Sequence, residues 1–165
     1  MNARIRKVNL ADAPRIREIY NYYISHSLTT FETVPISVEE VVRRIKKYSA
    51  RYPWYVAEIG AMVVGYAYAS EFVDRPAYAH TSETTIFIDK EYTGAGCGRA
   101  LYARLLEEMK KLNFAALISI IAIPNPASVR LHTLFGFEKV GHLKKAGYKL
   151  NTWIDVEYWE LLLPA

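Results

Sequence analysis

A run of three glycines within five residues, Gly94-Ala95-Gly96-Cys97-Gly98, constrains the fold of this chain more than any other feature. The apolar residues 86–88 before it predict a strand, and Leu101 and Leu105 after it belong to a helical pattern. Glycines at such a junction let several backbone N–H groups point the same way, beside the partial positive charge of a helix N-terminus. The sequence therefore predicts either a loop that binds a phosphate or pyrophosphate, or a tight turn in which glycine serves the geometry alone.

The remaining periodicity predicts a single α/β domain over residues 1–165. Apolar residues at helical spacing, with suitable N-caps, predict helices over residues 13–24, 38–49, 100–109 and 126–135. Alternating or continuous apolar runs predict strands over residues 5–8, 55–59, 62–70, 79–88, 114–123, 137–140 and 156–163. Because antiparallel strands come first and a strand–helix–strand unit follows, we expect a mixed, mostly antiparallel central sheet flanked by helices.

The composition disfavours several classes of protein. The chain has a single cysteine, Cys97, which excludes a disulfide within the chain and a zinc site built from cysteines. The net charge of +4 is spread along the chain, which disfavours nucleic-acid binding and suits a small anionic ligand. The histidines show no metal-ligand spacing, the N-terminus lacks a signal-peptide core, and residues 114–123 are too few to span a bilayer. We therefore expect a cytoplasmic protein with no metal and no membrane or nucleic-acid partner.

The residues after the glycines narrow the class of anion. A nucleoside-triphosphate loop places Lys and then Ser or Thr after its last glycine, whereas this chain has Arg99 and Ala100. A dinucleotide loop has the spacing G-x-G-x-x-G on the first strand–helix unit, whereas the spacing here is G-x-G-x-G in mid-chain. The sequence therefore disfavours both kinds of nucleotide-binding loop. Arg99 can still make a charge-assisted contact with a phosphate.

The segment from Thr93 to Arg99 resembles the acetyl-CoA pyrophosphate loop of the GNAT superfamily of N-acetyltransferases, which runs Q/R-x-x-G-x-G/A. Thr93 stands where the superfamily has Gln or Arg. A second pattern, N-x-x-S/A-x-x-x-Y-x-x-x-G-F, matches from Asn125 to Phe137, with His132 in place of the tyrosine. The resemblance implies acetyl-CoA as co-substrate, held by Ile86, Phe87, Ile88, Thr93, Gly94, Ala95, Gly96, Gly98, Arg99, Asn125 and Ser128.

Further matches, which span almost the whole chain, make it similar to the phosphinothricin N-acetyltransferase group. They include Ile19-Tyr20-Asn21, Thr81-Ser82-Glu83 and Gly147-Tyr148-Lys149. The resemblance implies acetylation of the amino group of a small amino acid or a toxic analogue, of the phosphinothricin, methionine sulfone or methionine sulfoximine type. It also implies a homodimer, for which Tyr158 and Trp159 are either interface or core residues. Transfer to another amine (a polyamine, an aminoglycoside or a protein N-terminus) and a non-catalytic CoA sensor are the alternatives.

Amine acetylation needs a base for the amine proton and a proton donor for the departing thiolate. Glu83 lies in a predicted strand of Thr, Ile and Phe, an apolar setting that raises a carboxyl pKa, and the resembling group has its proposed base here. The alternative to a catalytic role is that Glu83 is a structural residue, either hydrogen-bonded or placed on an edge strand. His132 is the second catalytic candidate. The alternative is a structural histidine whose ring nitrogens are hydrogen-bonded to the backbone. Tyr102 is either a contact of the cofactor sulfur or a core aromatic, and a backbone N–H of residues 86–88 is expected to polarise the thioester carbonyl.

The acceptor amino acid carries anionic groups, and five matched residues are candidates to bind it. Arg75, Lys149 and Tyr78 offer positive charge or a hydroxyl, and Phe31 and Trp153 offer apolar walls. Cys97 precedes the predicted helix, where a thiol pKa is lowered, but no Cys/His/Asn arrangement surrounds it. We therefore expect direct transfer rather than an acetyl-cysteine intermediate.

Overall fold

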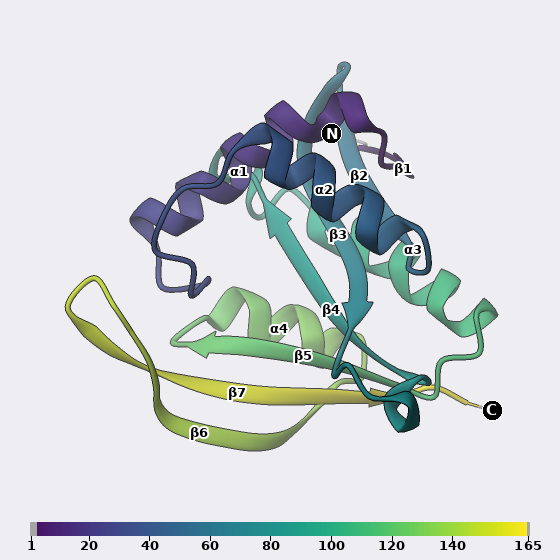
Figure 1. The fold of residues 1–165 in the computed structure, drawn as a ribbon, viewed down its shortest axis with the longest axis vertical. Helices are drawn as coiled ribbons and strands as arrows, with labels where there is room; N and C mark the ends of the chain where they lie inside the picture. Colours follow the sequence, from purple (N-terminus) through teal and green to yellow (C-terminus); the bar gives the residue numbers. More distant parts are fainter. Residues whose placement is uncertain (1–2, 165) are drawn as a thin grey trace.

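The computed structural model describes residues 3–164, which form one seven-stranded sheet with helices on both faces (Figure 1). The strands are β1 (Arg4–Lys7), β2 (Trp54–Ile59), β3 (Met62–Glu71), β4 (Thr81–Ile88), β5 (Ala116–Ile123), β6 (Glu138–Lys149) and β7 (Thr152–Leu162). The helices are α1 (Ala13–His26), α2 (Val38–Ser49), α3 (Cys97–Lys111) and α4 (Pro126–Leu134). The strand order is β1-β2-β3-β4-β5-β7-β6, and all pairs are antiparallel except β4 with β5. The predicted mixed, mostly antiparallel sheet and the predicted order of its elements are confirmed.

Two hydrophobic cores lie on opposite faces of the sheet. In β2, Trp54 and Val56 pack with α1 and α2, whereas Tyr55 and Ala57 pack with α3. Successive side chains of a strand point to opposite faces, so a strand covered on both sides reads as a continuous apolar run. All four of these residues are buried for that reason.

Local signals account for several element ends. Ser37 accepts a hydrogen bond from the amide of Glu40 and begins α2, as its sequence predicts. The Glu40 carboxylate, however, binds Arg43 and Arg44 on the next turn instead of reaching back to the Ser37 amide. After α4, Gly136 takes a φ of +84°, a conformation that favours glycine and ends the helix.

The final hairpin is longer than the sequence predicts. The prediction ends one strand at residue 140, whereas β6 continues to Lys149 and turns into β7 through Leu150 and Asn151, which both have positive φ. As the edge of the sheet, β6 is almost entirely exposed, and its register with β7 shifts between Leu143 and Gly147. No apolar alternation therefore marks it in the sequence. The turn of the hairpin projects from the body of the molecule (Figure 1).

Candidate active site

The candidate site lies where β4 and β5 separate. Their parallel pairing ends at Glu83 and Ile118, although β4 runs on to Ile88 and β5 to Ile123. Beyond that pair, the facing backbone groups of the two strands have no ladder partner within the described chain. A cavity of about 750 Å³ occupies this opening and is bordered by the beginnings of α3 and α4. The opening offers unpaired peptide groups to an extended ligand.

The glycine loop lines the same cavity. Gly94 and Gly96 have φ angles of +78° and +84°, which residues with a side chain rarely adopt. A Cβ at either position would meet no atom within 4 Å, so the backbone conformation and not the space requires glycine. Gly96 is the N-cap of α3, a 15-residue helix, and the exposed Arg99 follows in its first turn. A helix N-terminus with its dipole and a nearby guanidinium are groups that suit an anion, and the anion-binding role of this loop stays a prediction.

Asp89 anchors the segment that leads into this loop. Its amide donates a hydrogen bond to the Val64 carbonyl oxygen at 2.8 Å. Its carboxylate accepts from the amide of Glu91 at 2.9 Å and pairs with the guanidinium of Arg15 on α1. The start of the loop is therefore tied to both β3 and α1 before its glycines begin.

Glu83 lines the cavity at the last position of β4 that pairs with β5. Burial raises the pKa of its carboxyl, and no charged neighbour contributes to the shift. A carboxylate that is poorly solvated and has no cation beside it is a stronger proton acceptor than one at the surface. The raised pKa that the sequence predicts for this carboxyl is found, but its setting is not wholly apolar, because hydroxyl groups such as those of Tyr68 and Thr85 line the same cavity.

His132 presents an unused nitrogen beside the cavity. Its ring is 3% exposed, and Nδ1 lies 2.8 Å from the carbonyl oxygen of Ser128. Because a carbonyl only accepts, we assign the proton to Nδ1, which leaves the lone pair on Nε2. Nε2 is buried and has no hydrogen-bond partner among residues 3–164. Burial also lowers the pKa of the imidazole, which favours its neutral form, and the rings of Tyr102 and Phe137 pack edge-on at 5.0 and 5.1 Å.

Most of the residues predicted to hold acetyl-CoA surround this cavity. Those that line it are Ile86, Phe87, Ile88, Thr93, Gly94, Gly96, Gly98, Arg99, Asn125 and Ser128, and Glu83 and His132 join them. Ala95 lies exposed in the same loop, outside the lining. Asn125 also caps α4, since its Oδ1 accepts a hydrogen bond from the amide of Ser128 at 3.1 Å.

Tyr102 is placed differently from the other two catalytic candidates. It is fully buried in α3, and burial raises the pKa of its hydroxyl. The hydroxyl lies 2.7 Å from Thr84 Oγ1 and 3.0 Å from Ser119 Oγ. Thr84 and Ser119 line the cavity, whereas Tyr102 does not.

The five residues predicted to bind the acceptor, Phe31, Arg75, Tyr78, Lys149 and Trp153, do not line the cavity. Arg75 and Tyr78 lie in the turn between β3 and β4, and both are exposed. Phe31 packs over Gly147 so closely that a Cβ there would lie 2.8 Å from the ring, which explains the glycine.

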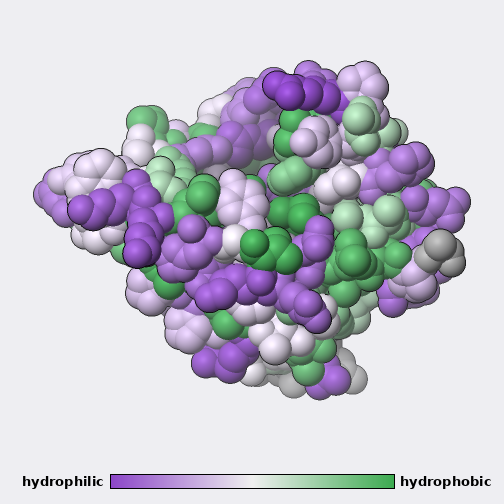
Figure 2. Space-filling model, turned by 90° about the horizontal axis from the view of Figure 1, so that it is seen from below, coloured by the Kyte–Doolittle hydropathy of each residue, from purple (hydrophilic) through white to green (hydrophobic). Residues whose placement is uncertain are grey.

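The hairpin exposes apolar side chains. Trp153 is 58% exposed and packs against Tyr148 with ring centroids 4.9 Å apart. The exposed large apolar residues of the hairpin are Val140, Leu143, Tyr148, Leu150, Trp153 and Leu162. Figure 2, which looks onto the β6 and β7 side, shows hydrophobic residues gathered between hydrophilic ones.

Lys149 uses its charge inside the protein. It is 5% exposed, and its ammonium donates hydrogen bonds to the carbonyl oxygens of Thr30 at 2.8 Å and Tyr23 at 3.3 Å. Burial lowers the pKa of this ammonium. The sequence predicts a contact with a substrate anion, whereas the structure shows a staple between the hairpin and the segment that follows α1.

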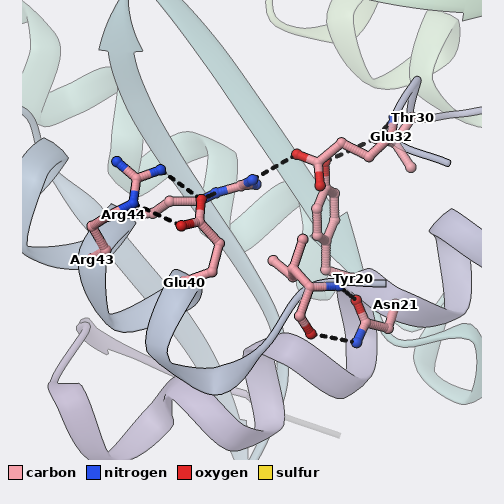
Figure 3. Close-up of polar contacts among 8 residues, drawn as sticks. Tyr20, Asn21, Thr30, Glu32, Glu40, Arg43 and Arg44 are labelled. Carbon is pink, nitrogen blue, oxygen red and sulfur yellow. Dashed lines mark hydrogen bonds and ion pairs between the residues drawn. The ribbon is translucent and has the colours of Figure 1, made fainter. Parts of the chain in front are cut away.

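That segment, residues 27–37, is held from three more directions (Figure 3). The hydroxyl of Tyr20 and Oγ1 of Thr30 share a hydrogen bond of 2.8 Å. Arg44 on α2 binds Glu32 at 2.7 Å, and the side chain of Asn21 pairs with the backbone at the end of the segment. Because residues 29 and 30 line the cavity, this network fixes one of its walls.

The sequence profile described as "Acetyltransferase (GNAT) domain" matches residues 5–158 of the chain. The chain belongs to the GNAT acetyltransferase family. The phosphinothricin N-acetyltransferase of Streptomyces viridochromogenes is 37% identical over 156 residues, which cover 94% of this chain and 85% of that protein. The L-methionine sulfoximine/L-methionine sulfone acetyltransferase of Salmonella typhimurium is 29% identical over 163 residues, which cover 96% and 94%.

Solved structures of GNAT proteins share the whole fold. The GNAT superfamily phosphinothricin acetyltransferase of Sinorhizobium meliloti, solved in complex with AcCoA, superposes with a TM-score of 0.96 at 34% identity. The superposition covers 99% of this chain and 89% of that one. The fold and the family predicted from the sequence are therefore confirmed.

Several residues of this GNAT site were missed by the sequence analysis. The cavity is also lined by Tyr20, Tyr23, Thr29, Thr30, Tyr68, Thr85 and Arg130. Tyr23 donates a hydrogen bond to the carbonyl oxygen of Ile88 at 2.5 Å, at the end of β4. Tyr20 and Tyr23 are three residues apart on one face of α1, and their rings fit the helical spacing of apolar residues that predicts this helix. The hydroxyl groups of these two tyrosines were the signal in the sequence that could have identified them as site residues.

Two absences concern residues 3–164 only. No group of three or more His, Cys, Asp or Glu side chains in this range is arranged to hold a metal ion. None of the helices in the described range is both long and apolar enough to cross a membrane.

Proposed function

We propose that this GNAT protein transfers an acetyl group from acetyl-CoA to the amino group of a small amino acid or an oxygen-rich analogue of one. The observation that carries the proposal is the opening between β4 and β5. It joins the glycine loop, the half-buried carboxylate of Glu83 and Nε2 of His132, which has no hydrogen-bond partner among residues 3–164, in one cavity. The relatives named above act, by their names, on phosphinothricin and on methionine sulfoximine or sulfone, and they support this acceptor class.

The cavity suits an elongated co-substrate that is anionic at one end. In the proposal, the amides of Gly96 and Gly98 and the guanidinium of Arg99 hold the pyrophosphate. The unpaired backbone of β4 lies along the arm, and one of its N–H groups polarises the thioester carbonyl. Acetyl-CoA supplies the activated acetyl group, and the protein supplies alignment and proton acceptors.

Two groups of this chain handle the protons. As the C–N bond forms and the C–S bond breaks, the amine loses one proton and the thiolate gains one. Glu83 takes the amine proton, directly or through water, because its raised pKa makes it a stronger base than a surface carboxylate. Glu83 then returns this proton through water to Nε2 of His132, which passes it to the sulfur, since Nδ1 remains bound to the Ser128 carbonyl.

The acceptor end of the cavity is rich in hydroxyl groups. Tyr20, Tyr68, Thr29, Thr30 and Thr85 line it around Glu83. Hydroxyls donate to sulfone, sulfoximine or phosphinate oxygens without adding charge. Arg75 and Tyr78 remain candidates for the carboxylate of the acceptor, and Phe31 and Trp153 for its apolar border.

We further propose that the protein acts in the cytoplasm as a homodimer. The support is the set of exposed apolar residues on the hairpin, defined above, because a stable monomer rarely leaves several large apolar side chains together in water. Light scattering of the purified protein at micromolar concentration tests the dimer, and a monomeric mass refutes it.

The experiment that tests the activity follows thiol release from acetyl-CoA with a panel of amines. The panel contains phosphinothricin, methionine sulfone, methionine sulfoximine, a polyamine, an aminoglycoside and a peptide with a free N-terminus. We expect turnover with the first three at the highest kcat/KM. Turnover only with another amine would show that the proposed class of acceptor is wrong. Tight acetyl-CoA binding with no turnover of any amine would favour a CoA sensor.

A further inference from the structure

Three buried hydroxyl groups meet where the β4–β5 ladder ends. The last ladder pair is Glu83 with Ile118, and the next residue on each strand is Thr84 and Ser119. Their hydroxyl oxygens lie 2.6 Å apart, so a side-chain hydrogen bond continues the pairing one step beyond the backbone ladder. The third hydroxyl comes from Tyr102 on α3, at 2.7 Å from Thr84 and 3.0 Å from Ser119.

The shortest hydrogen bonds of this cluster lie within it. Each hydroxyl has one proton to donate and can accept two hydrogen bonds. Thr84 Oγ1 also lies 3.4 Å from the carbonyl oxygen of Ile118, a longer contact than the 2.6 and 2.7 Å to Ser119 and Tyr102. Thr84, Ser119 and Tyr102 are 5%, 2% and 0% exposed, which makes each of these bonds costly to break without replacement. Tyr102 has hydrogen-bond partners for its proton within the cluster, and burial raises the pKa of its hydroxyl although the hydrogen bonds with Ser119 and Thr84 lower it.

We propose that Thr84, Ser119 and Tyr102 form a clamp that sets the separation of β4 and β5, and that Tyr102 is a positioning residue for acetyl transfer. Beyond the clamp, backbone hydrogen bonds no longer fix the distance between the two strands. The clamp also ties this point to α3, whose first residues follow the glycine loop. It thereby sets the position of the β4 backbone relative to the loop that holds the other end of the co-substrate.

The ring of Tyr102 adds a second link. It packs edge-on against His132 with centroids 5.0 Å apart and lies 5.8 Å from Phe137. Exchange of Tyr102 for Phe keeps this ring and removes only the hydroxyl. The variant Tyr102→Phe therefore separates the clamp from the packing around His132.

The test compares Tyr102→Phe and the isosteric Thr84→Val with two controls. Tyr55→Phe removes a tyrosine hydroxyl that is buried in the same core and has no hydrogen-bond partner among the described residues. Thr84→Ser keeps the hydroxyl that Thr84→Val removes. Kinetics rest on the proposed function, so the carbonyl stretching band of bound, ¹³C-labelled acetyl-CoA is recorded as well, because this readout needs no acceptor.

We expect Tyr102→Phe and Thr84→Val to lower kcat about tenfold or more, because small displacements of reacting groups are costly. Their acetyl-CoA Kd should stay within about threefold of wild type, since the glycine loop is untouched. Their carbonyl band should broaden and move toward the frequency of free acetyl-CoA. The control Tyr55→Phe should match the wild type in kcat, in Kd and in the band. Thr84→Ser keeps the hydroxyl, so its kcat and its band should lie nearer to the wild type than those of Thr84→Val.

An unchanged kcat and an unchanged band in Tyr102→Phe would overturn the proposal, since the hydroxyls would then be ordinary core contacts. A fall in acetyl-CoA affinity as large as the fall in kcat would also overturn it, because the effect would not be confined to the reacting end. If the wild type binds acetyl-CoA and turns over no amine, the proposed function fails while the band still decides the clamp.

Discussion

Replacement of Lys149 by Met tests the staple between the hairpin and residues 27–37. Met keeps most of the stem and removes an ammonium that is 5% exposed and bonded to the carbonyls of Thr30 and Tyr23. A hydrogen bond from a charged donor contributes about 2 kcal/mol at good geometry, and we assign about 1 kcal/mol to the longer one. Burial lowers the pKa of Lys149, so the ammonium carries a desolvation cost that Met lacks. We therefore expect a net loss of about 2 kcal/mol.

The assay has two parts. For a chain of this size the loss corresponds to a Tm about 4–8 °C lower, measured by calorimetry against the wild type. The KM for the amine should rise about tenfold, since the acceptor must then order the cavity wall at a cost of about 1.4 kcal/mol. The KM for acetyl-CoA should not change, because the staple lies away from the glycine loop.

The matched control is Lys144→Met, which removes an exposed lysine from the same strand. If Lys149→Met and Lys144→Met melt at the same temperature, the two carbonyl contacts do not stabilise the fold and the reasoning is wrong. If the KM values for amine and acetyl-CoA rise together, the staple supports the whole cavity and not its acceptor wall.

Three further outcomes follow from the site. Glu83→Gln should lower kcat about 10²–10⁴-fold with nearly unchanged acetyl-CoA affinity in calorimetric titration, and a collapse of that affinity would make Glu83 structural. Because burial raises the pKa of Glu83, the acid limb of the kcat/KM profile should lie above the ordinary range of a glutamate, and a limb within that range refutes this. The folded state then holds the proton of Glu83 more tightly, so its contribution to stability should decrease as pH rises through the folded pKa; denaturant titrations of Glu83→Gln should lack that part of the pH dependence. Cys97→Ala should keep kcat within about twofold, and loss of turnover in a variant that still binds acetyl-CoA would contradict direct transfer.

The parts of the site that depend on local sequence were predictable. The backbone of the glycine loop has positive φ at Gly94 and Gly96, and the glycines in the sequence indicate this conformation directly. Glu83 was found because one carboxylate interrupts an apolar strand, and its buried setting follows from the same pattern. Each of these signals lies within a few residues of the group that it identifies.

The parts that depend on contacts between distant segments were not predictable. Lys149 and Thr30 are 119 residues apart, and only the fold brings the ammonium to that carbonyl. A lone lysine near tyrosines reads equally well as an anion ligand, which is how the sequence analysis interpreted it. The strand β6 was predicted only as far as residue 140, because its edge position and the register shift after Leu143 remove the alternation that marks the rest of the strand.

The junction of β4 and β5 has the fewest residue pairs of any strand pairing in the sheet, with three. It divides the sheet into two half-sheets, β1–β4 and β5–β7, which share the core beneath α3. A ligand that lies in the opening touches both halves, so its binding free energy opposes any fluctuation that separates them. In the free enzyme we expect the largest fluctuations between the two half-sheets at the β4–β5 junction. In the occupied enzyme the two half-sheets should move together, because the bound co-substrate then connects them.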